Sequence, residues 1–179
     1  MSDFAKKTLH LIIDAVFMGI LIFADQFTKQ LAIENLKDKP ALNIIENVFE
    51  LNYLENRGAA FGLFQNQKAV FVVIAAVMLI LVCFLLYRLP LMKKYLILEI
   101  ALVMIGAGAI GNMIDRVAND YVVDFFYFVL INFPIFNVAD IYVTVSCVIL
   151  LIMFLWVYKE EDLEFLSKGL KTKPKKEEA

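Results

Sequence analysis

The chain has 179 residues, and 61% of them are apolar, against about 45–50% in an ordinary soluble domain. Together with a mean hydropathy of +0.74, this excess is too large for a globular domain, which excludes a soluble enzyme, a disordered protein and a nucleic-acid-binding protein. The formal net charge of −2 is close to neutral and therefore indicates neither a polyanionic nor a polycationic partner.

Four segments are apolar over a length that can cross a bilayer, whose hydrocarbon core requires about 20 residues of helix. They are residues 9–27, 69–87, 96–114 and 141–158. The second and fourth contain no charged residue, the third contains only Glu99, and the first contains only Asp14 and Asp25. The sequence therefore predicts an all-α integral membrane protein with four transmembrane helices.

Basic residues gather in the segments that flank the predicted spans on one side. Residues 1–8, 88–95 and 159–179 hold 11 Lys and Arg in 37 positions, whereas residues 28–68 and 115–140 hold 6 in 67. Since Lys and Arg are enriched in cytoplasmic loops, we expect both termini to be cytoplasmic and the two longer loops to face outward. Residues 1–158 would then form a single four-span domain, and residues 159–179 a charged cytoplasmic tail.

The first outward loop contains a segment with the pattern of a strand. Residues 49–53 alternate apolar and polar side chains, which predicts a half-buried strand at the membrane surface. A turn with small residues follows at residues 56–62, where backbone can approach a ligand closely. In the third span, the GAGAIG run at 106–111 predicts close helix packing.

Polar residues of this chain cluster where the spans reach the outward side. They are Asp25, Gln26, Thr28, Lys29, Asn112, Asp115, Arg116, Asp124, Asn137 and Asp140. Helical spacing places Asn112 and Arg116 on one face, with Asp115 on a different face, and it pairs Asp25 with Lys29.

Most of these residues also have a purely structural explanation. Asp140 falls in the first turn of a helix, where a carboxylate complements the helix dipole and Asn137 can act as the cap. Asp25 with Lys29 can be a helix-end ion pair of little energetic weight. Asp124 is harder to explain in this way, because it lies between two Val and two Phe at headgroup depth, where a carboxylate is costly to bury.

Two carboxylates that enter one rim from different segments indicate aspartic-protease chemistry. Carboxylates brought close together share one proton, so that one activates a water while the other protonates the leaving group. This chemistry needs no metal, cofactor, Ser or His, and the chain has one His, His10, and no Ser at the outward edge. Ser-His-Asp catalysis, Cys-His catalysis and paired-His metal sites are thereby excluded.

Five segments, taken in order, resemble the lipoprotein signal peptidases, the signal peptidase II family. They are DQFTK at 25–29, NRGAAF at 56–61, GNMIDR at 111–116, VDF at 123–125 and FNVAD at 136–140. The ordered set is far more specific than any one segment, and it comes with the family's four-span layout. Asp14 and the residues after Lys159 lie outside the resemblance and inherit no role from it.

The resemblance implies a membrane-embedded aspartic endopeptidase of the bacterial inner membrane, with its active site at the outer face. Its implied substrates are diacylglyceryl-modified prolipoproteins, from which it removes the signal peptide by cleavage before the lipidated Cys. Asp124 and Asp140 are implied as the catalytic pair. The residues implied to bind or orient the substrate are Asn56, Asn112, Arg116 and Asn137, and those implied to support them are Asp25, Lys29, Gly58 and Asp115.

The same resemblance implies a set of partners. The strand at 49–53 would belong to a small outward-facing β-sheet in the first outward loop, which cradles the substrate. The cyclic peptide globomycin would inhibit by lodging between the acids. Membrane lipid is the expected surrounding, and no metal or nucleic acid is expected. Since each buried methylene contributes about 0.8 kcal/mol, two acyl chains would hold the scissile bond near the headgroups, at the level of the acids.

Two hypotheses from other classes compete with a peptidase. A small transporter or channel with an outer acidic cation site predicts ionisable residues through the midplane of several spans, but the second and fourth spans have none. Asp14 alone cannot form an ion pathway across the membrane. A purely structural membrane subunit leaves the surroundings of Asp124 unexplained.

Overall fold

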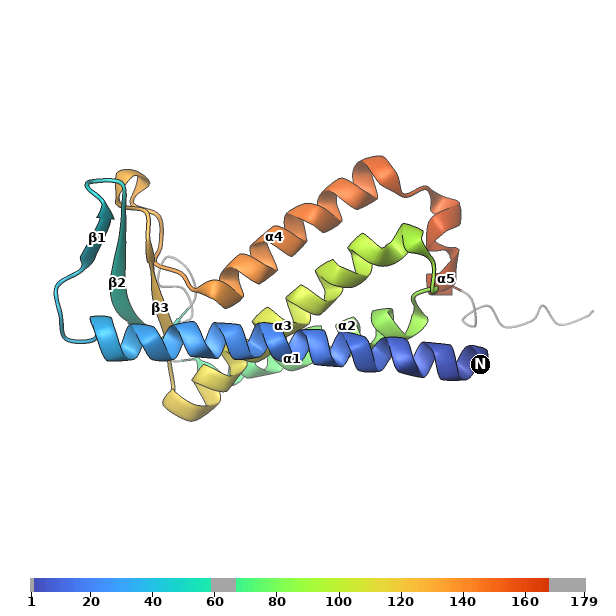
Figure 1. The fold of residues 1–179 in the computed structure, drawn as a ribbon, viewed down its shortest axis with the longest axis horizontal. Coiled ribbons are helices and arrows are strands. Elements are labelled where there is room, and N and C mark those ends of the chain that lie inside the picture. The colour runs from blue at the N-terminus through green and yellow to red at the C-terminus, as the bar shows by residue number, and fades with distance from the viewer. Residues whose placement is uncertain (1, 59–66, 168–179) are drawn as a thin grey trace, which may run out of the picture.

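The computed structural model describes residues 2–58 and 67–167. Long helices form its body, and a small sheet stands across one end of them (Figure 1). We call this the sheet end. The N-terminus and α5 (Glu164–Ser167) lie at the opposite end (Figure 1).

Four helices are long and apolar enough to cross a membrane, which confirms the predicted number of spans. They are α1 (Asp3–Leu36), α2 (Lys68–Arg88), α3 (Leu96–Asn119) with its preceding 3-10 turn η2 (Lys93–Tyr95), and α4 (Val138–Ile152) with the π-helical turn η4 (Met153–Val157). Half of the most apolar stretch of α3 is buried inside the protein, against 11–17% for the other three spans. α3 is therefore the central helix, and the other three direct most of their apolar surface outward, as helices in lipid do.

α1 continues well beyond its predicted span. Its 34 residues extend for about 51 Å at 1.5 Å per residue, whereas a bilayer core is roughly 30 Å thick. The additional turns at the sheet end remain helical because Ala32 and Leu36 are buried there against Val123 and Phe125. The first helix thus supports the sheet as well as crossing the membrane.

The sheet has three antiparallel strands in the order β1–β2–β3. They are β1 (Leu42–Ile45), β2 (Phe49–Asn56) and β3 (Val122–Tyr127). β2 contains the predicted strand, and it pairs with β3 so that Leu54 lies opposite Asp124 and Asn56 lies opposite Val122. β1 and β2 lie in the first outward loop, where the sheet was expected, but β3 comes from the loop between α3 and α4, so the first outward loop does not form the sheet alone. Alternation did not reveal β3 because its first four residues are all buried.

Glycines let α3 lie against its neighbours at short range, as the sequence predicted. A Cβ on Gly108 would lie 2.6 Å from the carbonyl oxygen of Ala139 and 2.7 Å from Cγ2 of Val143, both in α4. A Cβ on Gly106 would lie 2.7 Å from Cε of Met18 in α1. These distances are shorter than van der Waals contact. A side chain at position 108 would meet backbone and push α3 away from α4, whereas one at position 106 would have to displace the flexible end of Met18.

The chain after α4 folds back onto the opposite end. η5 (Glu160–Leu163) and α5 follow η4 there, and the Tyr95 hydroxyl donates to the carbonyl of Asp162 at 2.9 Å. Phe165 is buried beside Tyr95, and Arg88 donates to its carbonyl at 2.5 Å. The beginning of the predicted tail therefore packs on the helices through Asp162 and Phe165, and residues 168–179 lie outside the described part of the chain.

The opposite end also carries ionisable residues within the spans. Nε2 of His10 lies 2.8 Å from the carboxylate of Glu99, which joins α1 to α3, and Asp14 is 9% exposed.

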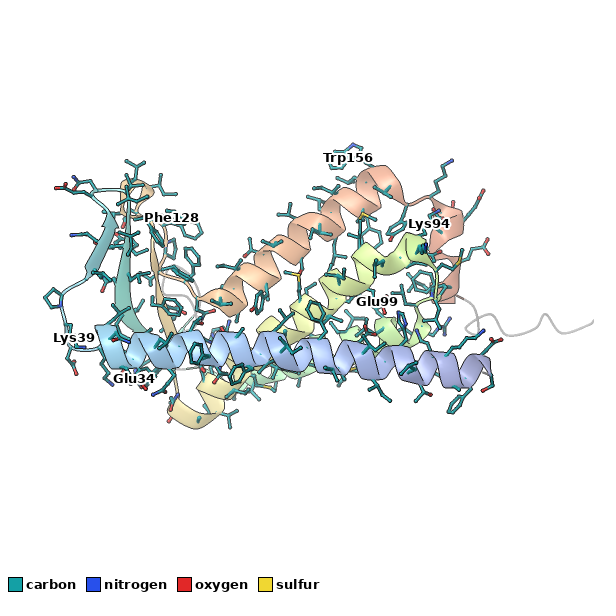
Figure 2. All side chains as sticks on the ribbon, in the orientation of Figure 1. Glu34, Lys39, Lys94, Glu99, Phe128 and Trp156 are labelled. Carbon is teal, nitrogen blue, oxygen red and sulfur yellow. The ribbon has the colours of Figure 1, made fainter. Side chains whose placement is uncertain are left out.

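Figure 2 shows Trp156 projecting away from the helices, and it is 74% exposed. Such an aromatic at a helix end is typical of a membrane–water interface.

Candidate active site

Asp124 and Asp140 are held by one asparagine at the sheet end. β3 carries Asp124, which is 1% exposed, and the first turn of α4 carries Asp140. Nδ2 of Asn137 donates to Asp124 at 2.6 Å, and the backbone N–H of Asn137 donates to Asp140 at 3.2 Å. The backbone N–H of Asp140 donates back to the Asn137 side chain at 3.0 Å, which closes a capping box. Asn137 therefore caps α4 and also links the two carboxylates.

Two further asparagines complete this network. Nδ2 of Asn56, at the end of β2, donates to the second oxygen of Asp124 at 2.8 Å. Nδ2 of Asn112, in α3, donates to the second oxygen of Asp140 at 2.8 Å. Asn137 also donates to the side-chain oxygen of Asn112 at 3.1 Å. Every oxygen of the two carboxylates thus accepts a hydrogen bond from an asparagine, and each asparagine is one that the sequence analysis selected.

The surroundings of Asp124 favour its protonated form. Burial, followed by the negative charge of Asp140, raises the pKa of Asp124 from 3.8 to about 7. The hydrogen bonds from Asn56 and Asn137 act in the opposite direction but are outweighed. A carboxyl that holds a proton near neutral pH next to a second carboxylate is the arrangement that acid–base chemistry requires.

Beneath the two acids, a buried ammonium joins three side chains. Nζ of Lys29 lies 2.9 Å from Asp25, 2.9 Å from Asp115 and 3.0 Å from the side-chain oxygen of Asn112. The Lys and both Asp side chains are at most 4% exposed, so this is no weak pair at a helix end. Asn112 and Asp115 converge on the same cation, and the expectation that they lie on different helix faces is wrong because three residues is close to one helical turn.

The two carboxylates of this cluster also hold backbone in place. Asp25 accepts from the backbone N–H of Ala139 in α4 at 2.9 Å, and Asp115 accepts from that of Val123 in β3 at 3.1 Å. Gln26 donates to Asp115 at 3.0 Å. In the sequence, Gln26 is one of the polar residues of this edge, but no role was predicted for it. Its position beside Asp25 was the available signal.

Arg116 and Gly58 lie at the edge of the asparagine network. The guanidinium of Arg116 donates to the carbonyl of Gly58 at 3.3 Å, and the Gly58 N–H donates to the side-chain oxygen of Asn56 at 3.0 Å. This second bond fixes which end of the Asn56 amide faces Asp124. Residues 59–62 of the predicted turn lie outside the described residues.

A cavity of about 510 Å³ opens beside Asp140. Asn56, Arg116 and Asp140 are its principal polar lining groups, and apolar residues from 133–136 and from α4 form most of the remainder. A smaller cavity of about 260 Å³ lies between α2, α3 and α4. Apolar cavities with a few convergent polar groups are typical of ligand sites.

No group of three His, Cys, Asp or Glu that could hold a metal ion occurs among residues 2–58 and 67–167. Asp25 and Asp115 face the Lys29 ammonium, and Asp124 and Asp140 face asparagine N–H donors. Donors of this kind compete with a cation for the same lone pairs.

The helices, the sheet and the paired aspartates together define a multi-pass membrane protein with a buried acidic site at one end. Residues 17–156 match the family model described as signal peptidase (SPase) II. The chain therefore belongs to the signal peptidase II family, a family of peptidases, as the resemblance of its five segments indicated.

Individual relatives agree with this assignment. The lipoprotein signal peptidase of Clostridioides difficile (strain 630) is 43% identical over 137 residues, which are 76% of this chain and 90% of the relative. That of Streptococcus thermophilus (strain CNRZ 1066) is 45% identical over 142 residues, which are 79% of this chain and 90% of the relative. A solved structure described as a bacterial membrane enzyme is similar with a TM-score of 0.71 at 25% identity, covering 90% of this chain and 92% of that one.

Proposed function

We propose that this protein is an aspartic endopeptidase that removes signal peptides from diacylglyceryl-modified prolipoproteins by cleavage before the lipidated Cys. The observation that carries the proposal is the single buried Asn137 that holds both Asp124 and Asp140 beside an apolar cavity. Curated relatives bear the name lipoprotein signal peptidase, which supports the same class of substrate.

The two acids divide the chemistry between them. Asp124 holds the shared proton, since its pKa is raised to about 7, and Asp140 is the base, at a helix N-terminus where the dipole favours negative charge. Asp140 takes a proton from water as the oxygen attacks the scissile carbonyl carbon, and Asp124 protonates the carbonyl oxygen. Asp140 then gives its proton to the leaving nitrogen, the C–N bond breaks, and a hydroxyl of the diol returns a proton to Asp124.

The remaining residues of the site hold this pair in position. Asn112 bonds both Asp140 and Lys29, so the buried ammonium cluster and the acids form one connected frame. Asn56, Asn137 and Arg116 border the cavity or the acids and would orient the bound peptide. Gly58, Asp25, Lys29 and Asp115 support them through the contacts described above.

We further propose that the sheet end faces outward from a bacterial cytoplasmic membrane, with both termini in the cytoplasm. The excess of Lys and Arg in the segments at the opposite end supports this orientation. Two acyl chains would then hold the scissile bond of the substrate close to the depth of Asp124 and Asp140.

One assay tests the proposal directly. Purified protein in mixed micelles is incubated with a diacylglyceryl-modified prolipoprotein, and mass spectrometry follows the product that begins at the lipidated Cys. We expect cleavage that globomycin blocks, because the cyclic peptide would occupy the space between the acids. The non-lipidated prolipoprotein is the matched control, and equal cleavage of both substrates would contradict a lipid-dependent peptidase.

A further inference from the structure

An aromatic ring of α2 lies against the guanidinium of Arg116. Cζ of Arg116 is 4.3 Å from the centroid of the Phe71 ring, well inside the limit of about 6 Å for a cation–π contact. Arg116 belongs to α3 and Phe71 to the beginning of α2, so the contact joins two spans at the sheet end. Phe71 has no place among the site residues that the sequence indicated.

Arg116 differs from Lys29 in how its charge is accommodated. Lys29 forms ion pairs with two carboxylates, whereas Arg116 forms none within the described part of the chain. Its hydrogen bonds go to the carbonyls of Gly58 at 3.3 Å and Asn112 at 3.4 Å. A guanidinium has five N–H donors in its plane, so donors remain for a ligand.

The chemistry of α2 explains why an aromatic side chain serves here. A carboxylate in this position would engage the in-plane donors of Arg116 and add a negative charge near Asp124 and Asp140. A ring attracts the cation from above its plane and leaves the N–H edges available. Residues 69–87 of α2 contain no charged residue, so an aromatic contact also spares the span the cost of a buried acid.

The contact lies where the two cavities of the site meet. Four residues line both of them: Phe71, Arg116, Asp140 and Thr144. Phe71 and Arg116 contribute the α2 and α3 walls of this junction, and Asp140 contributes the α4 wall. A peptide bound across this junction would therefore lie next to both the guanidinium and Asp140.

We propose that Phe71 is a positioning residue for substrate, which holds Arg116 at this junction so that the guanidinium donates to a backbone carbonyl of the bound signal peptide. The inference rests on the proposed function, because it takes a lipidated prolipoprotein as the ligand. It predicts that Phe71 acts on substrate binding and does so through Arg116.

Steady-state kinetics in mixed micelles test this, with KM expressed as the mole fraction of lipidated prolipoprotein. Phe71→Leu and Phe71→Met keep an apolar side chain but remove the ring, and we expect KM to rise about two- to thirty-fold with kcat changed by less than about twofold. Phe71→Tyr keeps the ring and should restore KM. A merely structural role would instead lower the active fraction, and hence kcat, at unchanged KM.

Two comparisons make the test specific. Phe84→Leu is the matched control, since Phe84 lies under Arg88 at 5.7 Å on the same helix near its other end, and it should leave KM unchanged. In an Arg116→Gln background, Phe71→Leu should have no further effect on KM, because the residue through which it acts is gone.

The outcomes separate this inference from the proposed function. Wild-type KM in both apolar variants, failure of Phe71→Tyr to restore it, or additive effects with Arg116→Gln would each overturn the role of Phe71. An Asp124→Asn protein that still cleaves would instead overturn the aspartic mechanism. If Asp124→Asn is inactive and Phe71→Leu is normal, only the positioning role is lost.

Discussion

The ammonium of Lys29 lies 2.9 Å from the carboxylate of Asp115, although α1 carries the first residue and α3 the second. The same ammonium donates to Asn112, which in turn donates to Asp140. One buried cation therefore connects the long first helix to a proposed catalytic acid through a single intervening side chain.

Removing the Asp115 carboxylate should lower the stability of the protein without stopping cleavage. Asp115→Asn leaves Lys29 with Asp25 as its one carboxylate partner, so we expect a lower free energy of unfolding, by about 1–3 kcal/mol, and slower cleavage. Thermal unfolding in detergent and the cleavage rate are the measurements. Asp120→Asn is the control, since Asp120 is exposed and pairs with Lys68 on the surface. Equal stability of the Asp115→Asn and wild-type proteins would show that Lys29 needs one acid only.

The two proposed catalytic acids should respond differently from Asp115. Asp124→Asn and Asp140→Asn keep the size of each side chain but remove the ability to exchange a proton. We expect each to reduce cleavage by at least about 10²-fold while the protein remains folded in detergent. Circular dichroism and thermal unfolding check the fold alongside the product assay. Near-normal turnover in either variant would remove that residue from the mechanism.

Replacing Gly111 of α3 should lower stability and activity, as replacing a polar residue of the site would. The Cβ of an alanine at position 111 would overlap the carboxylate of Asp25, which is fixed by Lys29 and by the backbone of Ala139. We therefore expect Gly111→Ala to lower both the unfolding temperature and the cleavage rate.

Gly19→Ala is the matched control for this substitution. No atom lies within 4 Å of a Cβ built on Gly19 in α1, and alanine favours helix by about 0.8–1.0 kcal/mol over glycine. Gly19→Ala should therefore leave activity unchanged and keep or raise stability. If Gly111→Ala behaved in the same way, α3 would have room to move away from α1.

Cleavage should not depend on an added metal ion. Each oxygen of Asp124 and Asp140 accepts an N–H donor from asparagine, and Asp25 and Asp115 both face the Lys29 ammonium. A cation would therefore have to compete with donors that these carboxylates already engage. Prolonged EDTA treatment followed by the product assay is the measurement. Activity that disappears and returns only with a divalent ion would replace the aspartic mechanism with a metal-dependent one.

The sequence predicted the parts of this protein that follow from local pattern. Hydropathy predicted the number of spans, and the alternation at residues 49–53 predicted β2. It did not predict β3, because both faces of that strand are buried and its sequence shows no alternation. It also gave no sign that α1 continues to Leu36, since the stability of those turns comes from packing against residues about ninety positions later in the chain.

The site shows the same division. The polar residues at the outward edge were visible in the sequence, and the resemblance assigned their roles, but neither indicated how Lys29 is shared. Convergence of Asn112 and Asp115 on one ammonium depends on where α1 crosses α3, which no local pattern specifies. The Arg116–Phe71 contact was missed for that reason as well, because Phe71 is one apolar residue among many in α2.

The raised pKa of Asp124 should also affect stability. Because the pKa is about 7 in the folded protein and near 3.8 when the residue is unperturbed, the folded state binds more protons than the unfolded state between these values. Stability should therefore fall as pH rises through this window, the reverse of an acid in a salt bridge. Thermal unfolding in detergent at pH 5 and pH 8 measures this, and Asp124→Asn should lose that part of the difference.

The pH dependence of cleavage tests the shared proton itself. The pair is active only when it holds one proton, so the rate should follow a bell-shaped curve whose limbs belong to the pair as a whole. The alkaline limb should fall near pH 7, where the raised pKa of Asp124 places loss of the remaining proton. The acid limb should fall where the second carboxylate, Asp140, becomes protonated and can no longer activate water.

The measurement is kcat against pH with lipidated prolipoprotein at saturating mole fraction, so that presentation of the lipid does not limit the rate. Asp115→Asn should keep the bell, because it leaves both acids in place. A flat profile in the wild-type protein, or a bell that persists in Asp124→Asn, would contradict a pair that works by sharing one proton.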